Sequence, residues 1–363
     1  MRPAFSQTLS RPASGGFALI IAMIAITVLG VLAAGFAFSM KVETRLAIKA
    51  KSDPQLLWLG RAGVELARWA LVQQTTIPGE PYDSLNQLWA GGPGGLGETN
   101  SPLQGVPLNH FPVGDGWLSI RIIDLERFAN INTAPPQMLQ QALNLMGVNA
   151  EDISVVSDSI QDWIQPGDNP RAAGAKSDYY QGLDPPYYCK DAPMDDLSEL
   201  LLVRGVTPAM YYGTGETHPD GVALPKLGLG NAPFQAPDYP FGLKDLFTTL
   251  STGRININTA GTNVLQLLPG VDGQIAEAIV RQRAGPDGMD GTDDDTPFQS
   301  PGQLATAGIP PPIVGEMSRF CTTRSATFKV FITAHCNGFS RDFTAILFRP
   351  GGPDVRVLSF YWK

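Results

Sequence analysis

The sequence contains, at residues 17–40, the apolar run FALIIAMIAITVLGVLAAGFAFSM, which has no charged residue. At a rise of about 1.5 Å per residue, a helix of this length extends over about 36 Å, enough to cross a hydrocarbon core of about 30 Å. The sequence therefore predicts one membrane-spanning helix close to the N-terminus.

A short basic leader precedes this run. It carries Arg2 and Arg11 and ends in Gly15-Gly16, directly before Phe17. A secretory signal peptide is cut after its apolar region, at a small-residue site on the far side. Here the small residues come first, so we expect cleavage of the Gly16–Phe17 bond and retention of the helix as an anchor. A plain signal-anchor helix that happens to follow two glycines is the alternative.

This leader resembles those of type IV pilins and type II secretion pseudopilins. The resemblance implies cleavage by a membrane prepilin peptidase, methylation, and Phe17 as the first mature residue. Most members carry Glu at mature position five, where this sequence has Ile21. A carboxylate in the membrane needs a partner, which in these filaments is the amine of a neighbouring subunit. A subunit added first has no such neighbour, so Ile21 fits the filament tip, as in the general secretion pathway protein K family.

The charge distribution bears on partners and orientation. The formal net charge is −8, and no acid precedes Glu43. Nucleic-acid binding requires clustered Lys and Arg, so we expect no nucleic-acid partner. Four basic residues follow the apolar run, so the positive-inside rule does not orient the anchor: Lys41, Arg45, Lys49 and Lys51.

The segment at residues 41–75 is expected to continue the helix outside the membrane. Small and apolar residues recur there at three- and four-residue steps and predict one packing face: Leu57, Gly60, Val64, Ala67 and Leu71. Asp53-Pro54 predicts a kink or a short break. A helical stalk that leads to an unrelated domain is the alternative.

Strand patterns occur at residues 117–124 and again at 327–335, 342–349 and 355–362. The last three of these predicted strands are separated by Asn337-Gly338 and Gly351-Gly352, residue pairs that favour tight hairpin turns. Strands on both sides of a helical middle suggest one antiparallel sheet with an inserted domain. The predicted fold class is α+β: a pilin-like long N-terminal helix packed on an antiparallel sheet, with a large inserted helical domain that contains helix-hairpin-helix-like repeats.

The repeats are the second strong signal. Asn-Ile-Asn-Thr-Ala occurs at residues 130–134 and at 256–260, and each copy precedes an apolar-periodic helix and a glycine turn. The second copy looks like the helix-hairpin-helix module of DNA-uptake proteins, in which glycine amides approach a phosphate. Asp272 replaces the second hairpin glycine and would repel that phosphate. We therefore interpret the repeat as packing, with a DNA-binding or uptake protein as the alternative function.

These patterns divide the chain into six parts: a basic leader (1–16), the transmembrane (17–40) and soluble (41–75) parts of the helix, the first part of the sheet (76–125), an inserted helical domain (126–250), and a second helix-hairpin-helix-like unit with an acidic loop and the C-terminal strands (251–363). The succession at residues 162–170, 174–180 and 196–200 closely resembles the helical domain that the protein K family inserts into its sheet.

The family resemblance implies a bacterial inner-membrane subunit, single-pass, with its soluble domain in the periplasm. It also implies a tip complex with the minor pseudopilins I and J, which starts growth of the pseudopilus that exports folded proteins. A minor subunit of a type IV pilus is the alternative. The sequence shows no nucleophile, zinc or phosphate-loop motif, so no enzymatic activity is predicted.

An acidic loop suggests a cation. Five carboxylates fall within nine residues, with glycines between them: Asp287, Asp290, Asp293, Asp294 and Asp295. Calcium takes six to eight oxygen ligands in flexible loops of this kind, so we predict Ca²⁺ there, with a solvated acidic insertion as the alternative. Asp162, Asp168 and Asp178 are a second, weaker set, because Gln165 and Lys176 stand where the family more often has acids.

The chain has three cysteines, Cys189, Cys321 and Cys336. Cys321 and Cys336 flank the predicted strand at 327–335, so a disulfide between them is a candidate if they face each other in an oxidising compartment. Three free buried thiols are the alternative. A zinc site from Cys321, His335 and Cys336 lacks a fourth ligand and is disfavoured.

Overall fold

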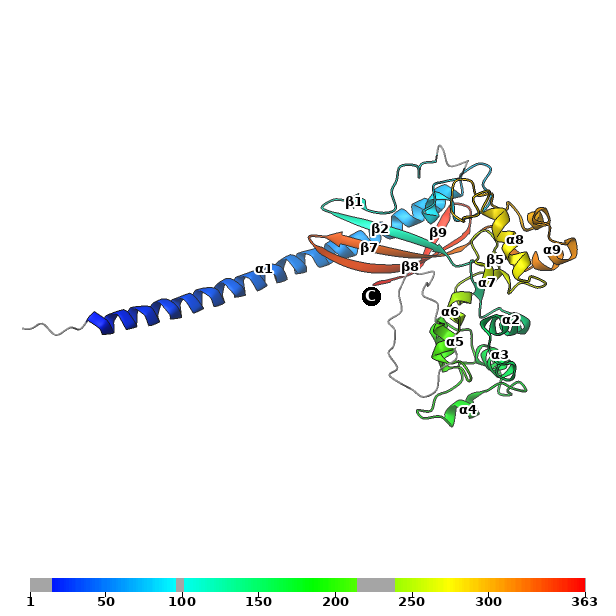
Figure 1. Cartoon of the computed structure of the whole chain (residues 1–363), viewed down its shortest axis with the longest axis horizontal. Coiled ribbons are helices and arrows are strands. Elements are labelled where there is room, and N and C mark those ends of the chain that lie inside the picture. Colours follow the sequence, from blue (N-terminus) through cyan, green and yellow to red (C-terminus); the bar gives the residue numbers. More distant parts are fainter. Residues whose placement is uncertain (1–14, 96–100, 214–238, 363) are drawn as a thin grey trace, which may run out of the picture.

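The computed structural model describes residues 15–95, 101–213 and 239–362. Helix α1 (Gly15–Gln74) comprises 60 residues. Its first half projects away from the body of the protein, and its second half lies against the sheet (Figure 1). The chain stays helical through Pro54, so the predicted short break is wrong. The turn after β7 supports the helix at this point, because Asn337 Nδ2 donates to Ser52 Oγ at 3.1 Å and to Gln55 Oε1 at 3.0 Å.

The main sheet has five antiparallel strands in the order β1-β2-β7-β8-β9. The strands are β1 (Phe111–Val113), β2 (Gly116–Asp124), β7 (Thr327–Cys336), β8 (Phe339–Gly351) and β9 (Asp354–Trp362). The four strands predicted from alternation are confirmed. Asn337 and Gly338 have φ angles of 53° and 79°, as a two-residue hairpin turn requires.

Helix α1 packs on one face of this sheet through the predicted residues, of which Gly60, Val64, Ala67 and Leu71 are buried and Leu57 is half-buried. A Cβ atom on Gly60 would lie 2.7 Å from the ring of Phe343, and one on Gly63 would lie 2.6 Å from Ile332 Cγ2. Because larger side chains have no room at these positions, the two glycines set the close approach of helix and sheet.

Two helical units lie between β2 and β7. The first helical unit (residues 129–248) comprises β3 (Ala129–Asn130), α2 (Pro136–Met146), α3 (Ala150–Ile164), α4 (Ser177–Gln181), η3 (Leu197–Leu202), α5 (Pro208–Tyr212), α6 (Leu243–Leu246) and β4 (Phe247–Thr248). The second helical unit (residues 255–322) comprises β5 (Ile255–Asn256), α7 (Thr262–Leu265), α8 (Gly273–Arg283), η4 (Pro301–Ala307), α9 (Pro311–Met317) and β6 (Cys321–Thr322). A further short helix, η1 (Leu88–Ala90), follows α1.

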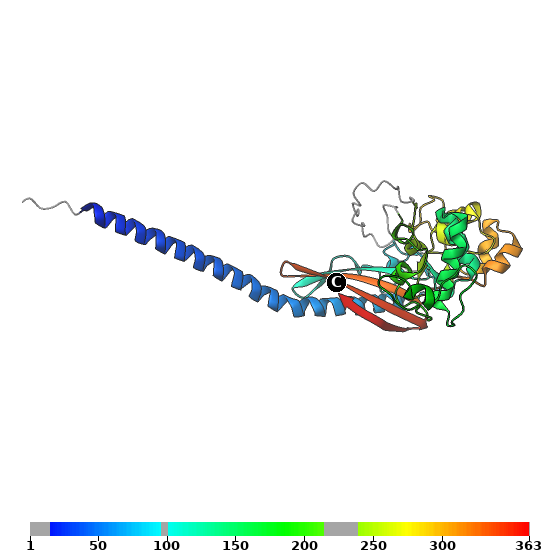
Figure 2. The same ribbon diagram turned by 90° about the horizontal axis from the view of Figure 1, so that it is seen from below.

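Both units are closed in the same way, by a parallel pairing of their first and last strands. Strand β3 pairs with β4, and β5 pairs with β6. The helices of the two units bury one continuous apolar core, whereas α1 and the sheet form a separate core. Figures 1 and 2 show the units at the end of the sheet farthest from the projecting part of α1.

The Asn-x-Asn repeat makes the same hydrogen bonds twice. The backbone N–H of Asn132 donates to Asn130 Oδ1, and that of Asn258 donates to Asn256 Oδ1, each at 2.9 Å. The second asparagine of each pair then binds the backbone of a distant residue with both amide atoms: Asn132 binds Met194 at 2.7 and 3.0 Å, and Asn258 binds Phe298 at 2.9 Å twice. The sequence repeat is thus a structural repeat, while its likeness to helix-hairpin-helix modules stays a prediction.

Candidate functional site

The apolar anchor is exposed on all sides. Phe17 is 74% exposed and Phe36 is 69% exposed, and no residue at 17–40 is buried. Among the described residues, one helix, Phe17–Gln74, is long and apolar enough to cross a membrane. Ile21, at the predicted mature position five, is part of this exposed surface. An N-terminal helix of this kind fits anchoring in a membrane.

The predicted cleavage site lies at the start of α1. The helix begins at Gly15, so Gly16 and Phe17 fall in its first turn. Most of the predicted leader, residues 1–14, lies outside the described residues. Cleavage at Gly16–Phe17 therefore stays a prediction.

A buried network of polar groups joins the second helical unit to the sheet. The amide of Asn256 donates from Nδ2 to Asp124 Oδ2 at 3.1 Å, to the carbonyl oxygen of Asp83 at 3.1 Å and to Ser325 Oγ at 2.8 Å. The hydroxyls of Ser325 and Thr259 donate to the same Asp124 oxygen, at 2.6 and 2.5 Å. These groups come from β2, the second unit and two connecting loops, so the network fixes their relative positions.

A buried arginine pairs with one acid of this network. The Arg349 guanidinium pairs with the Asp83 carboxylate and donates to the carbonyl oxygens of Ser325, at 2.8 Å, and Leu71, at 3.2 Å. Both charged side chains of this pair are 1% exposed. Removing one partner of such a pair leaves an uncompensated buried charge. The end of α1 is therefore tied to the same junction.

Glu126 is the third acid at this junction and is also fully buried. It accepts hydrogen bonds from the backbone N–H groups of Thr252, at 3.2 Å, and Thr327, at 2.9 Å. Burial, and then the charge of nearby Asp124, raise the pKa of Glu126 to about 8. Burial likewise raises the pKa of Asp124. Three acids are thus buried at this junction, and the raised pKa of Glu126 favours its protonated form at neutral pH.

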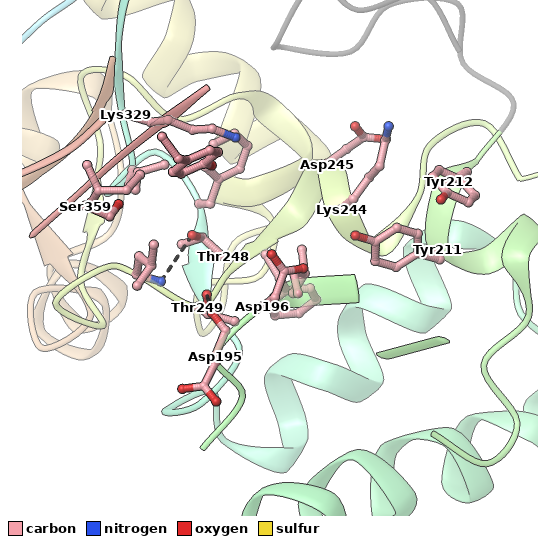
Figure 3. Close-up of a pocket in the computed structure, with 17 residues that line it drawn as sticks. Asp195, Asp196, Tyr211, Tyr212, Lys244, Asp245, Thr248, Thr249, Lys329 and Ser359 are labelled. Carbon is pink, nitrogen blue, oxygen red and sulfur yellow. Dashed lines mark hydrogen bonds between the residues drawn. The ribbon is translucent and has the colours of Figure 1, made fainter. Parts of the chain in front are cut away.

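A cleft separates the first helical unit from the sheet. It encloses about 560 Å³ and is lined on one side by the first unit and on the other by β7, β8 and β9. Figure 3 shows Tyr211 and Asp196 on the side of the first unit, and Lys329 and Ser359 on the side of the sheet. Hydrogen bonds from Ser198, together with the charge of Lys329, lower the pKa of Asp196. The first unit thus faces the sheet across a cleft with both polar and apolar lining residues.

The acidic loop is ordered by internal hydrogen bonds. Arg283, whose side chain is 4% exposed, binds Asp290 through both carboxylate oxygens, at 2.9 and 2.6 Å. Asp294 Oδ2 accepts from the backbone of Asp287 at 2.9 Å, and Asp295 Oδ2 accepts from that of Gly291 at 2.8 Å. Asp293 is exposed. Among the described residues no group of three or more His, Cys, Asp or Glu side chains is placed to hold a metal ion, and calcium binding stays a prediction.

The second predicted cation set is not brought together. Asp162 is buried, but Asp168 and Asp178 are exposed. The Asp162 carboxylate is already bound by Arg171, through Nη1 at 3.0 Å and through the backbone N–H at 2.9 Å. The proposed grouping is wrong, because a protein cation takes the one buried acid of the set.

The candidate disulfide is also wrong, since all three cysteines are free buried thiols. Cys321 lies in β6, which pairs with β5, and belongs to the core of the helical units. Cys336 ends β7 and belongs to the core of the sheet, opposite Gly116 and Phe339. The two side chains lie in different cores because the strand preceding β7 in the chain belongs to the second helical unit.

Sequence reasoning missed the junction network. Asp124 and Glu126 are close in the sequence, but Asp83 and Arg349 lie far from them, and the bond from Ser325 to Asp83 joins residues 242 positions apart. No local spacing reveals such a group.

Comparisons with known proteins agree with this architecture. The family model for type II secretion system protein K matches residues 120–213, which contain the C-terminal part of β2 and most of the first helical unit. Type II secretion system protein K of Aeromonas hydrophila is 25% identical over 217 residues, which are 54% of this chain and 60% of the relative. Protein K of Pseudomonas aeruginosa PAO1 is 25% identical over 301 residues, 79% of this chain and 77% of the relative.

The fold is shared with a solved structure. A chain in the crystal structure of the GspK-GspI-GspJ complex from enterotoxigenic Escherichia coli aligns with a TM-score of 0.61 and 18% identity, covering 87% of this chain and 99% of that chain. The chain spans 60% and 59% of the Aeromonas hydrophila and Klebsiella pneumoniae relatives that it matches. The predicted helix-and-sheet fold is confirmed, and the family model, the relatives and the solved structure support the predicted resemblance to the type II secretion system protein K family.

Proposed function

We propose that this chain is a minor pseudopilin at the tip of the type II secretion pseudopilus, where it initiates assembly of the fibre that exports folded proteins across the outer membrane. Residues 17–40 anchor it in the inner membrane, and the soluble part faces the periplasm. The prepilin peptidase frees Phe17 before assembly. The role is structural, and no reaction is assigned to the chain.

The position of the helical units carries this proposal. They lie beyond the end of the sheet that is farthest from the anchor (Figures 1 and 2). In a fibre built from parallel anchor helices, that end points toward the next subunit above. Two helical units at this place would collide with such a subunit, whereas they project freely from the end of the fibre. The steric argument therefore favours the tip.

Ile21 gives independent support. A pseudopilin inside the fibre places an acid at this position against the amine of a neighbour, and an unpaired acid in the membrane is unfavourable. This chain has an apolar residue there, exposed on the anchor. A subunit that is added first does not need the acid.

Partners I and J are proposed from the related complex and from the free surface of α1. The solved neighbour comes from a complex of GspK, GspI and GspJ. In this chain the helix also exposes large apolar residues outside the predicted membrane segment, including Leu46 (60%) and Trp58 (65%). Helices of partner subunits would cover these side chains, as in a bundle.

The test uses full-length proteins expressed together in the membrane and purified in detergent. We expect the chain to co-purify with minor pseudopilins I and J, and gold labels at residues 140–210 to mark only fibre ends in electron micrographs. Labels along the shaft would contradict the tip assignment. N-terminal sequencing from the native host should begin at Phe17, and a start at Met1 would contradict cleavage.

A variant tests the role of Ile21 directly. Ile21→Glu restores the acid that subunits inside a fibre carry, and it should lower initiation because the new carboxylate has no partner at the tip. Ile24→Glu, three residues along the same exposed helix, is the matched control for the general cost of an acid in the membrane. Equal fibre counts for wild type and Ile21→Glu would contradict the argument.

The alternative DNA-binding role has a direct test. Titration with duplex DNA at low and high salt should show no salt-dependent binding, because Asp272, which caps α8 and whose side chain accepts from the backbone of Ile275, would repel a phosphate at the hairpin. Salt-dependent binding would favour the DNA-binding alternative.

A further inference from the structure

Lys176 is a buried lysine with a complete set of oxygen ligands. Its side chain is 6% exposed. The ammonium group donates to the carbonyl oxygens of Asp162 and Gln165, each at 2.6 Å, and to Asp191 Oδ1 at 2.5 Å. An ammonium has three N–H donors, so every donor has one acceptor.

The carbonyl ligands belong to the C-terminus of a helix. Helix α3 ends at Ile164, and Gln165 is its C-cap residue. The last carbonyl groups of a helix lack partners within the helix and carry partial negative charge. A cation at this place satisfies two of them and interacts favourably with the helix dipole.

The same oxygens are the kind that a hard metal ion prefers, and the sequence suggested a cation there. The donor set does not fit a metal ion in this chain. The ammonium of Lys176 stands among the carbonyl oxygens, and Arg171 neutralises the Asp162 carboxylate. Arg171 also donates from Nη2 to Gln165 Oε1 at 2.8 Å. A divalent ion added to this group would meet two positive charges at close range.

We infer that Lys176 is the resident cation of the loop at residues 165–191, and that the first helical unit folds without a metal ion at this place. The lysine does what a structural ion would do: it draws the end of α3 toward Asp191. A buried ammonium without these partners is strongly unfavourable, so the loop closes only when all three oxygens are in place.

Two neighbouring features depend on this closure. Asp191 has a positive φ of 51°, a backbone conformation that is uncommon for residues other than glycine, and the bond to Lys176 stabilises it. Cys189 Sγ lies 3.6 Å from the carbonyl oxygen of Asp162, the same atom that Lys176 binds. Cys189 is buried and therefore reports on the opening of this loop.

The experiment measures alkylation of Cys189 by iodoacetamide in the full-length protein in detergent, with the modified cysteine identified by mass spectrometry. The wild type, Lys176→Met and Lys176→Glu are each compared in EDTA and in calcium. Lys244→Met is the matched control, because it removes a lysine of the same unit that lies over the Tyr212 ring, at 5.2 Å.

We expect slow alkylation of the wild type that EDTA does not change. Lys176→Met should react roughly tenfold faster in both conditions, because three charge-assisted hydrogen bonds are lost. Lys176→Glu should react faster in EDTA and return toward the wild-type rate in calcium, since a carboxylate replaces the ammonium among the same oxygens. Lys244→Met should match the wild type.

Three results would overturn the inference. Faster alkylation of the wild type in EDTA would mean that a metal ion holds the loop. An unchanged rate in Lys176→Met would mean that the ammonium does not hold it. Equal rates of Lys176→Glu in EDTA and calcium would mean that these oxygens are not a cation site. If Lys176→Met fails to fold, the inference is tested by two remaining measurements: the alkylation rate of the wild type in EDTA, and the rates of Lys176→Glu in EDTA and in calcium.

Discussion

The two helical units use one sequence motif in two different surroundings. In the second unit, Asn256 is fully buried and donates to the carboxylate of Asp124 in the sheet. In the first unit, the side chain of the equivalent Asn130 donates to the carbonyl oxygen of Ser251, at 2.6 Å, and accepts from the backbone of Asn132, so these bonds stay outside the sheet. The second unit is thus bonded to the sheet through a buried network, while the first faces it across the cleft of Figure 3.

A second pair of equivalent residues shows the same difference. Gln161 Nε2 donates to the carbonyl oxygen of Ala134 at 3.1 Å, and Arg283 Nη1 donates to that of Ala260, the matching residue of the repeat, at 2.7 Å. Only the arginine continues to a carboxylate, that of Asp290. The repeat therefore supplies the same internal hydrogen bonds in each unit, and the residues around it differ in the further bonds that they make.

The largest expected effect is a pH dependence at the junction of the second unit. The folded pKa of Glu126 is about 8, against 4.5 for an ordinary Glu. The folded state therefore binds more protons between these values, and the free energy of unfolding should fall as the pH rises from about 4.5 to about 8, by at most roughly 5 kcal/mol. Urea unfolding of the full-length protein at pH 5, 6.5 and 8 measures this.

Glu126→Gln is the control for that dependence. Glutamine keeps the shape of a protonated Glu and does not titrate, so the slope of stability against pH should become clearly smaller. The slope that remains reports Asp124, whose pKa is also raised. Wild-type stability that rises over this window, or an unchanged slope in Glu126→Gln, would contradict the proposed burial of the acids.

The next effect compares the two asparagines. Asn256→Ala removes hydrogen bonds to a buried carboxylate and a buried carbonyl, and should cost about 3 kcal/mol. Asn130→Ala removes bonds within the helical region alone, and should cost about 1 kcal/mol. Both values come from urea unfolding under the same conditions. Equal losses of unfolding free energy in the two variants would contradict the inferred difference between the two helical units.

A smaller effect is expected at the second equivalent pair. Arg283→Gln gives the second unit the residue type of the first, loses the bonds to Asp290 and should cost about 2 kcal/mol. Gln161→Leu loses a single hydrogen bond and should cost about 1 kcal/mol. Thermal unfolding followed by circular dichroism compares them. An unchanged melting temperature in Arg283→Gln would show that the Arg283–Asp290 pair does not stabilise the fold.

The smallest effect concerns calcium at the acidic loop. We propose that Ca²⁺ binds the carboxylates that Arg283 leaves free, and that it raises the melting temperature of the full-length protein by about 2–4 °C. Asp287→Asn with Asp293→Asn should abolish this rise without disturbing the Arg283–Asp290 pair. Lys176→Met should keep it, because that residue belongs to the first unit. A melting curve that calcium leaves unchanged in the wild type would reject the site.

Much of the fold was predictable because its signals are local. The alternation at residues 327–335 predicts β7, and Asn337-Gly338 predicts its turn, because the pleat and the hairpin need those residue types within a few positions. The sequence left the choice between a disulfide and free cysteines open, and it did not reveal how the acids at 162, 168 and 178 lie, because these outcomes depend on which strand pairs with which and on Arg171, which binds Asp162.

The amino-acid sequence by itself determined the anchor, the strands and the repeat. Each of these is marked by a local pattern: the length of the apolar run, the alternation of apolar and polar residues, and the identity of two short segments. Only the tertiary structure decided that Asp83, Asp124, Glu126 and Arg349 lie at one buried junction, that Asn256 of the second unit bonds to Asp124 of the sheet, and that Lys176 fills a cation site. These outcomes depend on contacts between residues far apart in the chain, where burial turns an ordinary charge into a determinant of structure.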